Sequence, residues 1–228
     1  MENLDKRTLQ FLESLRYIAQ QGLHYATGDA HDQARYEKLL TMASDAYGIV
    51  LQTPAEPIHQ AFLREQGHIT PKVGVNGALI NPAGQFFLVK RRDDQRWSLP
   101  CGWCDVNETP EQALAREFNE EVGWTVEVKD LVHIFTRLPG EHNALHTSYH
   151  VVYLCALATA TPPALHLEPN EIIEAGWFDL NNTLSLEWHR DHEAFAHAAF
   201  KHWAQQQGAS VPCAVVPPIA KGDLSNGN

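Results

Sequence analysis

Long apolar runs are missing from this sequence, since no stretch approaches the roughly 20 residues that a membrane-spanning helix requires. The segment from Met1 to Arg7 mixes both signs of charge and leads into no apolar region, so a secretory signal is not expected. Cysteine is scarce too, and four cysteines in 228 residues are too few for a disulfide scaffold. These absences predict a cytoplasmic protein without a membrane partner.

Basic residues are also few, with 17 lysines and arginines against 28 acids and a net charge of −11. This balance argues against non-specific binding of DNA or RNA, which rests on neutralising backbone phosphates. The hydrophobic share of 44% and charged share of 20% are typical of a globular protein, with one large domain or an ordinary domain plus a small one. An acidic protein that handles an anion needs an intermediary, and metal ions are the usual one.

Two of the four cysteines form a C-x-x-C motif, Cys101-Gly102-Trp103-Cys104. Such a motif can be redox-active or can supply half of a zinc site. There is no second C-x-x-C, and the thirteen histidines show no ligand-like pairing around it. Trp103 also stands where redox motifs of thioredoxin-like proteins usually carry proline. The motif is better explained by the segment that follows it.

The first 68 residues predict a small helical module. Apolar residues recur at helical spacings from Leu4 to about Ala26, again after Asp29, and in a short stretch from Pro57 to Glu65. A module of this size buries little core alone, so we expect it to pack on the rest of the chain or on a second subunit.

Residues 69–207 predict a second, mixed α/β domain. Strands are expected over 72–80 and 85–90, joined as a β-hairpin by the turn Asn81-Pro82-Ala83-Gly84. Further strands are expected over 125–136, 147–158 and 172–178, and a closing helix over 186–207. The tail, 208–228, is rich in Pro, Gly and Ser and is expected to be disordered.

A helix is predicted from Thr109 to Val122. Thr109 suits the N-cap, Pro110 the first helical position, and Gln112 completes a capping box. Gly123 fits the C-terminal position that takes a left-handed backbone. Leu114, Phe118 and Val122 recur every four residues and predict a buried stripe.

Three acids of this helix, Glu117, Glu120 and Glu121, project from one face because they are spaced i, i+3 and i+4. Their mutual repulsion costs a few tenths of a kcal/mol per pair. The negative end of the helix dipole adds about 0.3–1 kcal/mol each. A divalent cation would reverse both penalties, and magnesium prefers such oxygen ligands. The alternative is a solvated charge run.

The segment from Gly102 to Trp124 resembles the Nudix box, the signature of the Nudix hydrolase superfamily. It reads Gly-x5-Glu-x7-Arg-Glu-Phe-x-Glu-Glu-x-Gly-Trp. The residues at the fixed positions are Gly102, Glu108, Arg116, Glu117, Glu120, Glu121 and Gly123. The preceding Trp97-Ser98-Leu99-Pro100 is also similar to the family, whereas Cys101 replaces a common glycine.

The resemblance implies an α/β/α sandwich with a mixed sheet, Mg²⁺ or Mn²⁺ as cofactor, and cleavage of a nucleoside diphosphate linked to another moiety. It implies that Glu117, Glu120 and Glu121 are metal ligands, with the carbonyl of Cys101 as a fourth. Arg116 would orient a catalytic glutamate, and Glu108 would brace the loop against the helix.

The general base is left open among Glu171, Glu174 and a box glutamate, and the first two could equally be exposed loop carboxylates. Arg91 and Arg92 are candidates for holding the substrate's phosphates, although Asp93 and Asp94 could neutralise them at a solvated strand end. Among the aromatic residues Trp97, Trp103 and Phe135, which could stack on a base or lie in the core, Trp97 is the candidate for substrate binding. No role is assigned to the histidines.

The entry Ile69-Thr70-Pro71-Lys72-Val73, placed after a helical module, resembles the Nudix subgroup that acts on ADP-ribose or CDP-choline; an ordinary proline-marked linker is the alternative. The expected substrate is therefore ADP-ribose or a CDP-alcohol, cut to a nucleoside monophosphate and a phosphorylated partner, and the module is expected to form a homodimer. Rival interpretations are a nucleoside triphosphate pyrophosphatase, a non-catalytic ADP-ribose sensor and an isomerase on the same fold.

Overall fold

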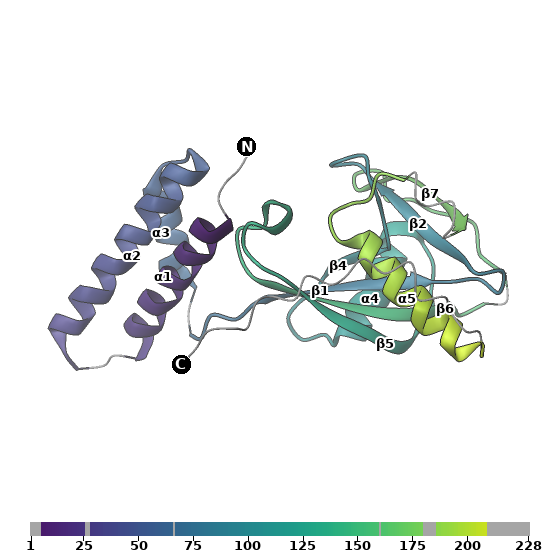
Figure 1. The fold of residues 1–228 in the computed structure, drawn as a ribbon, viewed down its shortest axis with the longest axis horizontal. Coiled ribbons are helices and arrows are strands. Elements are labelled where there is room, and N and C mark those ends of the chain that lie inside the picture. The colour runs from purple at the N-terminus through teal and green to yellow at the C-terminus, as the bar shows by residue number, and fades with distance from the viewer. Residues whose placement is uncertain (1–5, 26–27, 66, 160, 180–185, 209–228) are drawn as a thin grey trace. The chain divides into compact units, whose positions relative to one another are not determined.

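The computed structural model of the chain describes residues 6–25, 28–65, 67–159, 161–179 and 186–208. The chain divides into two compact units (Figure 1). One unit comprises residues up to Lys72 together with 136–149, and the other comprises 73–135 and the residues from His150 onward. No helix in these described ranges is long and apolar enough to cross a membrane.

The first unit is built on three helices, α1 (Lys6–Tyr25), α2 (Ala30–Leu51) and α3 (Ala55–Arg64), as the sequence predicts (Figure 1). Asp29 caps α2, because its carboxylate accepts a hydrogen bond from the backbone N–H of His31 at 2.8 Å. Leu9 and Leu12 of α1 pack with Tyr47 of α2, and Phe62 of α3 lies against them. These contacts give the module a small apolar core of its own.

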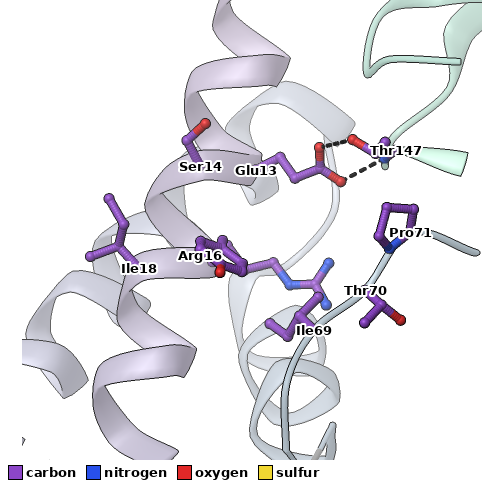
Figure 2. Close-up of a pocket in the computed structure, with 9 residues that line it drawn as sticks. Glu13, Ser14, Arg16, Ile18, Ile69, Thr70, Pro71 and Thr147 are labelled. Carbon is purple, nitrogen blue, oxygen red and sulfur yellow. Dashed lines mark hydrogen bonds between the residues drawn. The ribbon is translucent and has the colours of Figure 1, made fainter. Parts of the chain in front are cut away.

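The segment 136–149 belongs to this same unit and is fastened to α1. The Glu13 carboxylate accepts hydrogen bonds from both the backbone N–H and the hydroxyl of Thr147, each at 2.6 Å (Figure 2). Lys6 forms an ion pair with Glu141, which lies in a short 3-10 turn, Glu141–Asn143. A pocket of about 470 Å³ lies beside the Glu13–Thr147 contact (Figure 2).

The second unit carries two sheets. The strands β1 (Lys72–Leu79), β4 (Cys101–Trp103), β5 (Val126–Arg137) and β6 (Ser148–Leu157) form a four-stranded sheet in the order β4-β1-β6-β5. The strands β2 (Gln85–Arg91), β3 (Trp97–Ser98) and β7 (Ile172–Asp179) form a three-stranded sheet in the order β3-β2-β7. Two helices complete the unit, α4 (Pro110–Val122) and α5 (His192–Gln206).

Alternate residues of the strands face different helices. On β2, Phe87 and Val89 pack in a cluster with the apolar residues of α4, whereas Phe86 and Leu88 pack in a second cluster with those of α5. Strands β1 and β6 divide in the same way, because side chains alternate across a strand with a period of two. The strands therefore lie between two helical layers. The predicted α/β/α sandwich behind a helical module is confirmed.

The predicted β-hairpin over 72–90 is wrong in its pairing. The turn itself is present, since Gly84 N–H donates to the Asn81 carbonyl at 2.9 Å. The two strands nevertheless enter different sheets and share one isolated bridge, Ile80 to Phe86. The physical reason is tertiary packing, because the buried residues 86–89 have one face covered by the α4 cluster and the other by the α5 cluster. Within this layer β2 pairs along its length with β7.

The closing helix begins later than expected, at His192 rather than Leu186, because the residues before it run alongside β3. The Trp97 N–H donates to the Glu187 carbonyl at 2.8 Å, and residues 97 and 188 form an isolated parallel β-bridge. The domain division 1–68, 69–207 and 208–228 stays a prediction, and residues 209–228 of the predicted tail lie outside the described ranges.

Candidate active site

Helix α4 begins and ends where the sequence predicts. The Thr109 side chain accepts from Gln112 N–H at 3.3 Å, and the Gln112 side chain accepts from Thr109 N–H at 2.8 Å, which completes the capping box. Gly123 ends the helix with a left-handed backbone, at φ 73°. The buried residues Leu114, Phe118 and Val122 fix the helix against the sheet, so the direction of its acidic side chains is fixed as well.

Arg116 is the centre of an ionic network. Its guanidinium binds both carboxylate oxygens of Glu108, with Nη2–Oε1 at 2.8 Å and Nε–Oε2 at 3.2 Å. Its Nη1 donates to Glu117 and to Glu120, each at 2.9 Å, and Nη2 also donates to the Trp103 carbonyl at 3.0 Å. The arginine lowers the pKa of the Glu108 carboxyl through these hydrogen bonds. Arg116 thereby joins the loop before α4 to two of the acids on the helix.

Glu117 and Glu121 are buried acids, with 9% and 2% of their surfaces exposed. Burial is the main cause that raises the pKa of both carboxyls, and the charge of Glu117 raises that of Glu121 further. The backbone N–H of Cys101 donates to Glu121 Oε2 at 3.3 Å. Glu120 is exposed and is turned towards Arg116. Two of the three predicted ligands therefore lie together under the loop, and the third lies at the arginine.

The donor chemistry fits a divalent cation. The pKa of both buried carboxyls is raised, mainly by burial, and a positive ion would stabilise their charged forms. Magnesium and manganese prefer such oxygen ligands. Within the described ranges, no group of three His, Cys, Asp or Glu side chains converges at metal-binding distance. Glu117 and Glu121, with the backbone at Cys101, are the groups placed to hold an ion.

Gly102 is required by the closeness of Glu117. A Cβ atom at residue 102 would lie 2.0 Å from the Glu117 carboxylate, too close for any real contact. Strand β4 and helix α4 therefore approach each other through this glycine, which places the carboxylate against the backbone of the loop.

The cysteines of the C-x-x-C motif are free thiols. Burial raises the pKa of Cys101 to about 12, and burial also raises the pKa of Cys104. Cys101 Sγ lies 3.9 Å from Arg91 Nη1. A thiol with such a high pKa is a poor nucleophile, because the thiolate is the reactive form.

The two candidate bases differ in their surroundings. Glu171 is exposed, and its charge contributes to raising the pKa of both Glu117 and Glu121, so it lies within electrostatic range of the buried pair. The Glu171 carbonyl accepts from Arg92 N–H at 2.7 Å. Glu174 is paired with Lys90 across strands β2 and β7, at 3.8 Å.

The predicted substrate-binding residues lie at the end of β2 and in β3. Arg91 pairs with Asp93 through two hydrogen bonds of 3.0 and 2.8 Å, and its charge lowers the pKa of Glu121. Arg92 donates through Nε to the Pro169 carbonyl at 2.6 Å. Trp97 is only 8% exposed and packs against Phe178, with ring centroids 4.5 Å apart.

Sequence reasoning gave no role to His192 and considered Trp103 only as one of three aromatic residues that could stack on a base, yet the fold brings both to the same loop. His192 Nδ1 accepts from Leu99 N–H at 3.2 Å, two residues before Cys101. Trp103, beside the arginine network, is 46% exposed and lies 6.0 Å from the ring of His150. Neither contact leaves a signal in the sequence, because the partners lie 93 residues apart in the first case and 47 in the second.

Two segments of the chain match models of known protein families. Residues 70–199 match the NUDIX domain, and residues 6–62 match a UDP-X-like, N-terminal oligomerisation domain. The first match covers more than half of the chain.

Similar proteins agree with these matches. "Putative ADP-ribose pyrophosphatase YjhB" of Bacillus subtilis is 27% identical over 170 residues, which is 75% of this chain and 81% of that protein. A solved UDP-X diphosphatase has a TM-score of 0.50 at 20% identity and covers 89% of this chain and 95% of its own. The NUDIX domain of Shewanella oneidensis NrtR, solved with ADP ribose, has a TM-score of 0.51 at 17% identity, covering 63% and 97%. The two structural likenesses concern the fold.

Proposed function

Because the chain belongs to the NUDIX domain family, we propose that it is a pyrophosphohydrolase that cleaves a nucleoside diphosphate linked to another moiety, with ADP-ribose as the leading substrate. The observation that carries this proposal is the buried pair Glu117 and Glu121, held beside the Arg116 network at the loop of Cys101. A sensor that only binds a nucleotide has no need for such a pair.

In the proposed reaction, water adds to one phosphorus of the diphosphate and the bridging P–O bond breaks, so ADP-ribose gives AMP and ribose 5-phosphate. Glu117, Glu120 and Glu121, with the Cys101 carbonyl, are the residues that would hold Mg²⁺ or Mn²⁺. When bound, such an ion supplies Lewis-acid chemistry at the phosphates. Arg116 acts as a positioning residue, since its hydrogen bonds to Glu117 and Glu120 fix both carboxylates.

We assign the general base to Glu171, whose carboxylate would accept the proton of the attacking water. Its exposure leaves it accessible to water, and its charge reaches the buried pair. Glu174 is a weaker candidate because Lys90 already pairs with it. A box glutamate is the remaining alternative.

The ADP-ribose assignment is supported by the Bacillus subtilis relative, whose likeness extends over three quarters of this chain. We propose that Arg91 and Arg92 bind the substrate's phosphates, because the Arg91 guanidinium lies 3.9 Å from Cys101 of the box loop and Arg92 follows it directly after β2. The proposed contact of Trp97 with the base needs a shift of the ring, which is 8% exposed, and Trp103 offers a more accessible aromatic surface. CDP-choline stays a second candidate substrate, and a nucleoside triphosphate a third.

The test is a hydrolysis panel with Mg²⁺ or Mn²⁺ and ADP-ribose, CDP-choline, NADH, a diadenosine polyphosphate and the nucleoside triphosphates. Glu120→Gln should lose most of the activity, whereas Glu127→Gln, an exposed acid on β5, should keep it. Tight ADP-ribose binding without turnover of any compound would favour the sensor. Release of pyrophosphate from triphosphates alone would favour the triphosphate pyrophosphatase.

We also propose that the chain forms a homodimer in the cytoplasm through its N-terminal module. The match of residues 6–62 to an oligomerisation domain supports an oligomer. Measurement of the molar mass in solution tests the dimer, and cell fractionation tests the location.

A further inference from the structure

Helix α1 carries a second apolar stripe on the side that the module's own core does not use. Phe11, Ile18 and Tyr25 follow one another at seven-residue intervals and are 64%, 52% and 60% exposed. With 3.6 residues per turn, the three side chains leave the helix within about 40° of one another. The buried residues of α1, Leu9 and Leu12 among them, leave it on the other side. A helix that is apolar on two faces needs a second partner.

The middle of this stripe is a ridge between two hollows. Tyr17 and Ile18 line the pocket of about 470 Å³. Ile69 and Pro71 belong to the same lining (Figure 2). Tyr17 and Ile18 also line a second pocket, of about 480 Å³, whose far wall is Tyr36 of α2. A ridge flanked by hollows is self-complementary, because a two-fold axis through the ridge sets each copy's ridge beside the other copy's hollows.

The occupant that this surface fits is a second copy of the chain. Apolar residues at seven-residue spacing are the pattern by which one helix packs along another. Residues 6–62, which contain all of α1, match an oligomerisation domain. We therefore propose that two copies associate through α1, with the helices antiparallel and crossing at Ile18. This inference rests on the homodimer proposed above and adds the surface and the register.

The antiparallel direction follows from the order of residues along α1. Crossing at Ile18 sets Phe11 beside Tyr25 of the partner subunit, so two exposed aromatic rings cover each other at each end. The same register keeps apart the basic N-terminal ends of the two helices, each of which begins with Lys6 and Arg7. A parallel pair would instead place Arg7 against its own copy, and like charges repel.

The first experiment measures the molar mass by sedimentation equilibrium over a range of concentrations. The wild type should have the mass of two 25.6 kDa chains. Ile18→Arg should sediment as one chain, with a dimer dissociation constant at least about 100-fold higher, because a charge would be buried at the axis. Ile49→Arg is the matched control, since Ile49 is an 80% exposed apolar residue on α2 of the same module, and it should stay dimeric. Circular dichroism checks that both variants keep their helices.

The second experiment tests the register by oxidative cross-linking of introduced cysteines, with the wild type oxidised in parallel to show any background from native thiols. Ile18→Cys should cross-link to its own copy. Phe11→Cys should cross-link when mixed with Tyr25→Cys, but not alone. Efficient linking of Phe11→Cys to itself would overturn the antiparallel arrangement.

The possible failures are distinguishable. A wild type that stays a single chain at all concentrations overturns the homodimer and this interface together. A wild-type dimer that Ile18→Arg leaves intact overturns the interface alone. The hydrolysis panel does not depend on either result.

Discussion

At the scale of single residues, the site depends on close approach as much as on charge. The Glu117 carboxylate lies where a side chain at residue 102 would begin, so the absence of one atom sets the position of a proposed metal ligand. Arg116 also holds the same carboxylate through a hydrogen bond of 2.9 Å. The two constraints leave Glu117 little freedom to move.

We predict that Gly102→Ala lowers kcat about 100-fold or more, because the new methyl group displaces Glu117 and a shift of about 1 Å at a reacting centre can cost that much. Gly176→Ala is the control, since its Cβ would meet the nearest ring only at 3.5 Å. Steady-state kinetics on the best substrate of the panel gives the answer. Equal kcat values for the two variants would contradict the positioning role of Gly102.

The Trp103 ring predicts a separate effect on substrate affinity. The Trp103 carbonyl accepts a hydrogen bond from Arg116 and the ring is 46% exposed, so a nucleotide base bound beside the proposed metal ligands can stack on it. Because removal of a base-stacking aromatic costs about 1–3 kcal/mol, Trp103→Ala should raise KM about tenfold or more with a small change in kcat.

Trp103→Phe should restore most of this affinity, whereas Val106→Ala, an exposed apolar change in the same loop, should leave KM unaltered. An unchanged KM in Trp103→Ala would exclude the stacking contact.

At the scale of elements, the sequence predicted helix α4 almost residue by residue. Thr109, Pro110, Gln112 and Gly123 are local signals that act within one turn, and the structure uses each of them as expected. The pairing of β2 could not be predicted, because the turn at Asn81–Gly84 is equally compatible with strands of one sheet or of two. Its actual partner, β7, begins at Ile172, and no local pattern connects the two strands.

The residues of the candidate site also divide into those that local sequence signals predicted and those that tertiary packing brings in. The acids and Arg116 lie on one short helix and its loop, so their spacing alone brought them together. The hydrogen bond from Leu99 to His192 depends on where α5 begins, which is set by tertiary packing. Trp97 shows the limit of reading aromatic residues from sequence, because the side chain lies in the core beside Phe178.

The segment 136–149 makes the stability of the helical unit depend on pH. Burial and the charge of Lys72 lower the pKa of His146 below its usual 6.5, with Arg16 acting in the same direction and Glu13 and Glu65 opposing it. His146 therefore binds a proton more readily in the unfolded chain than in the folded protein. The stability from neutral His146 is present above about pH 6.5 and is lost as pH falls through the lowered pKa.

We predict that wild-type protein loses more unfolding free energy than His146→Gln between pH 7.5 and 5, as measured by urea denaturation at each pH. His31→Gln, which removes an exposed histidine from α2, should follow the wild type. Identical pH dependence in His146→Gln and wild type would contradict the prediction.

At the scale of the whole molecule, the buried acids proposed to bind the metal lower the stability of the folded state. Two carboxylates with raised pKa destabilise the metal-free chain, and a bound divalent ion would offset that cost. The native state should therefore gain stability from Mg²⁺ or Mn²⁺.

We predict that metal at 100 times its Kd stabilises the protein by about 2.7 kcal/mol, an upward shift of several degrees in Tm. Glu121→Gln should lose this shift, and without metal it should be at least as stable as wild type, because it removes a buried charge. Thermal unfolding with metal and with a chelator measures both effects, and Glu127→Gln should behave like wild type. A full metal-induced shift in Glu121→Gln would contradict its role as a ligand.

The separation of β2 from its partner also determines when the catalytic unit can fold during synthesis. Strand β2, with four consecutive buried residues at 86–89, leaves the ribosome long before β7, with which it pairs along its whole length. Until residue 172 and its successors have emerged, the nascent chain carries an apolar strand without its sheet, which is an aggregation hazard. Truncated products that end before β7 are thus natural clients for chaperones and proteases, although every residue of helix α4 is already present in them.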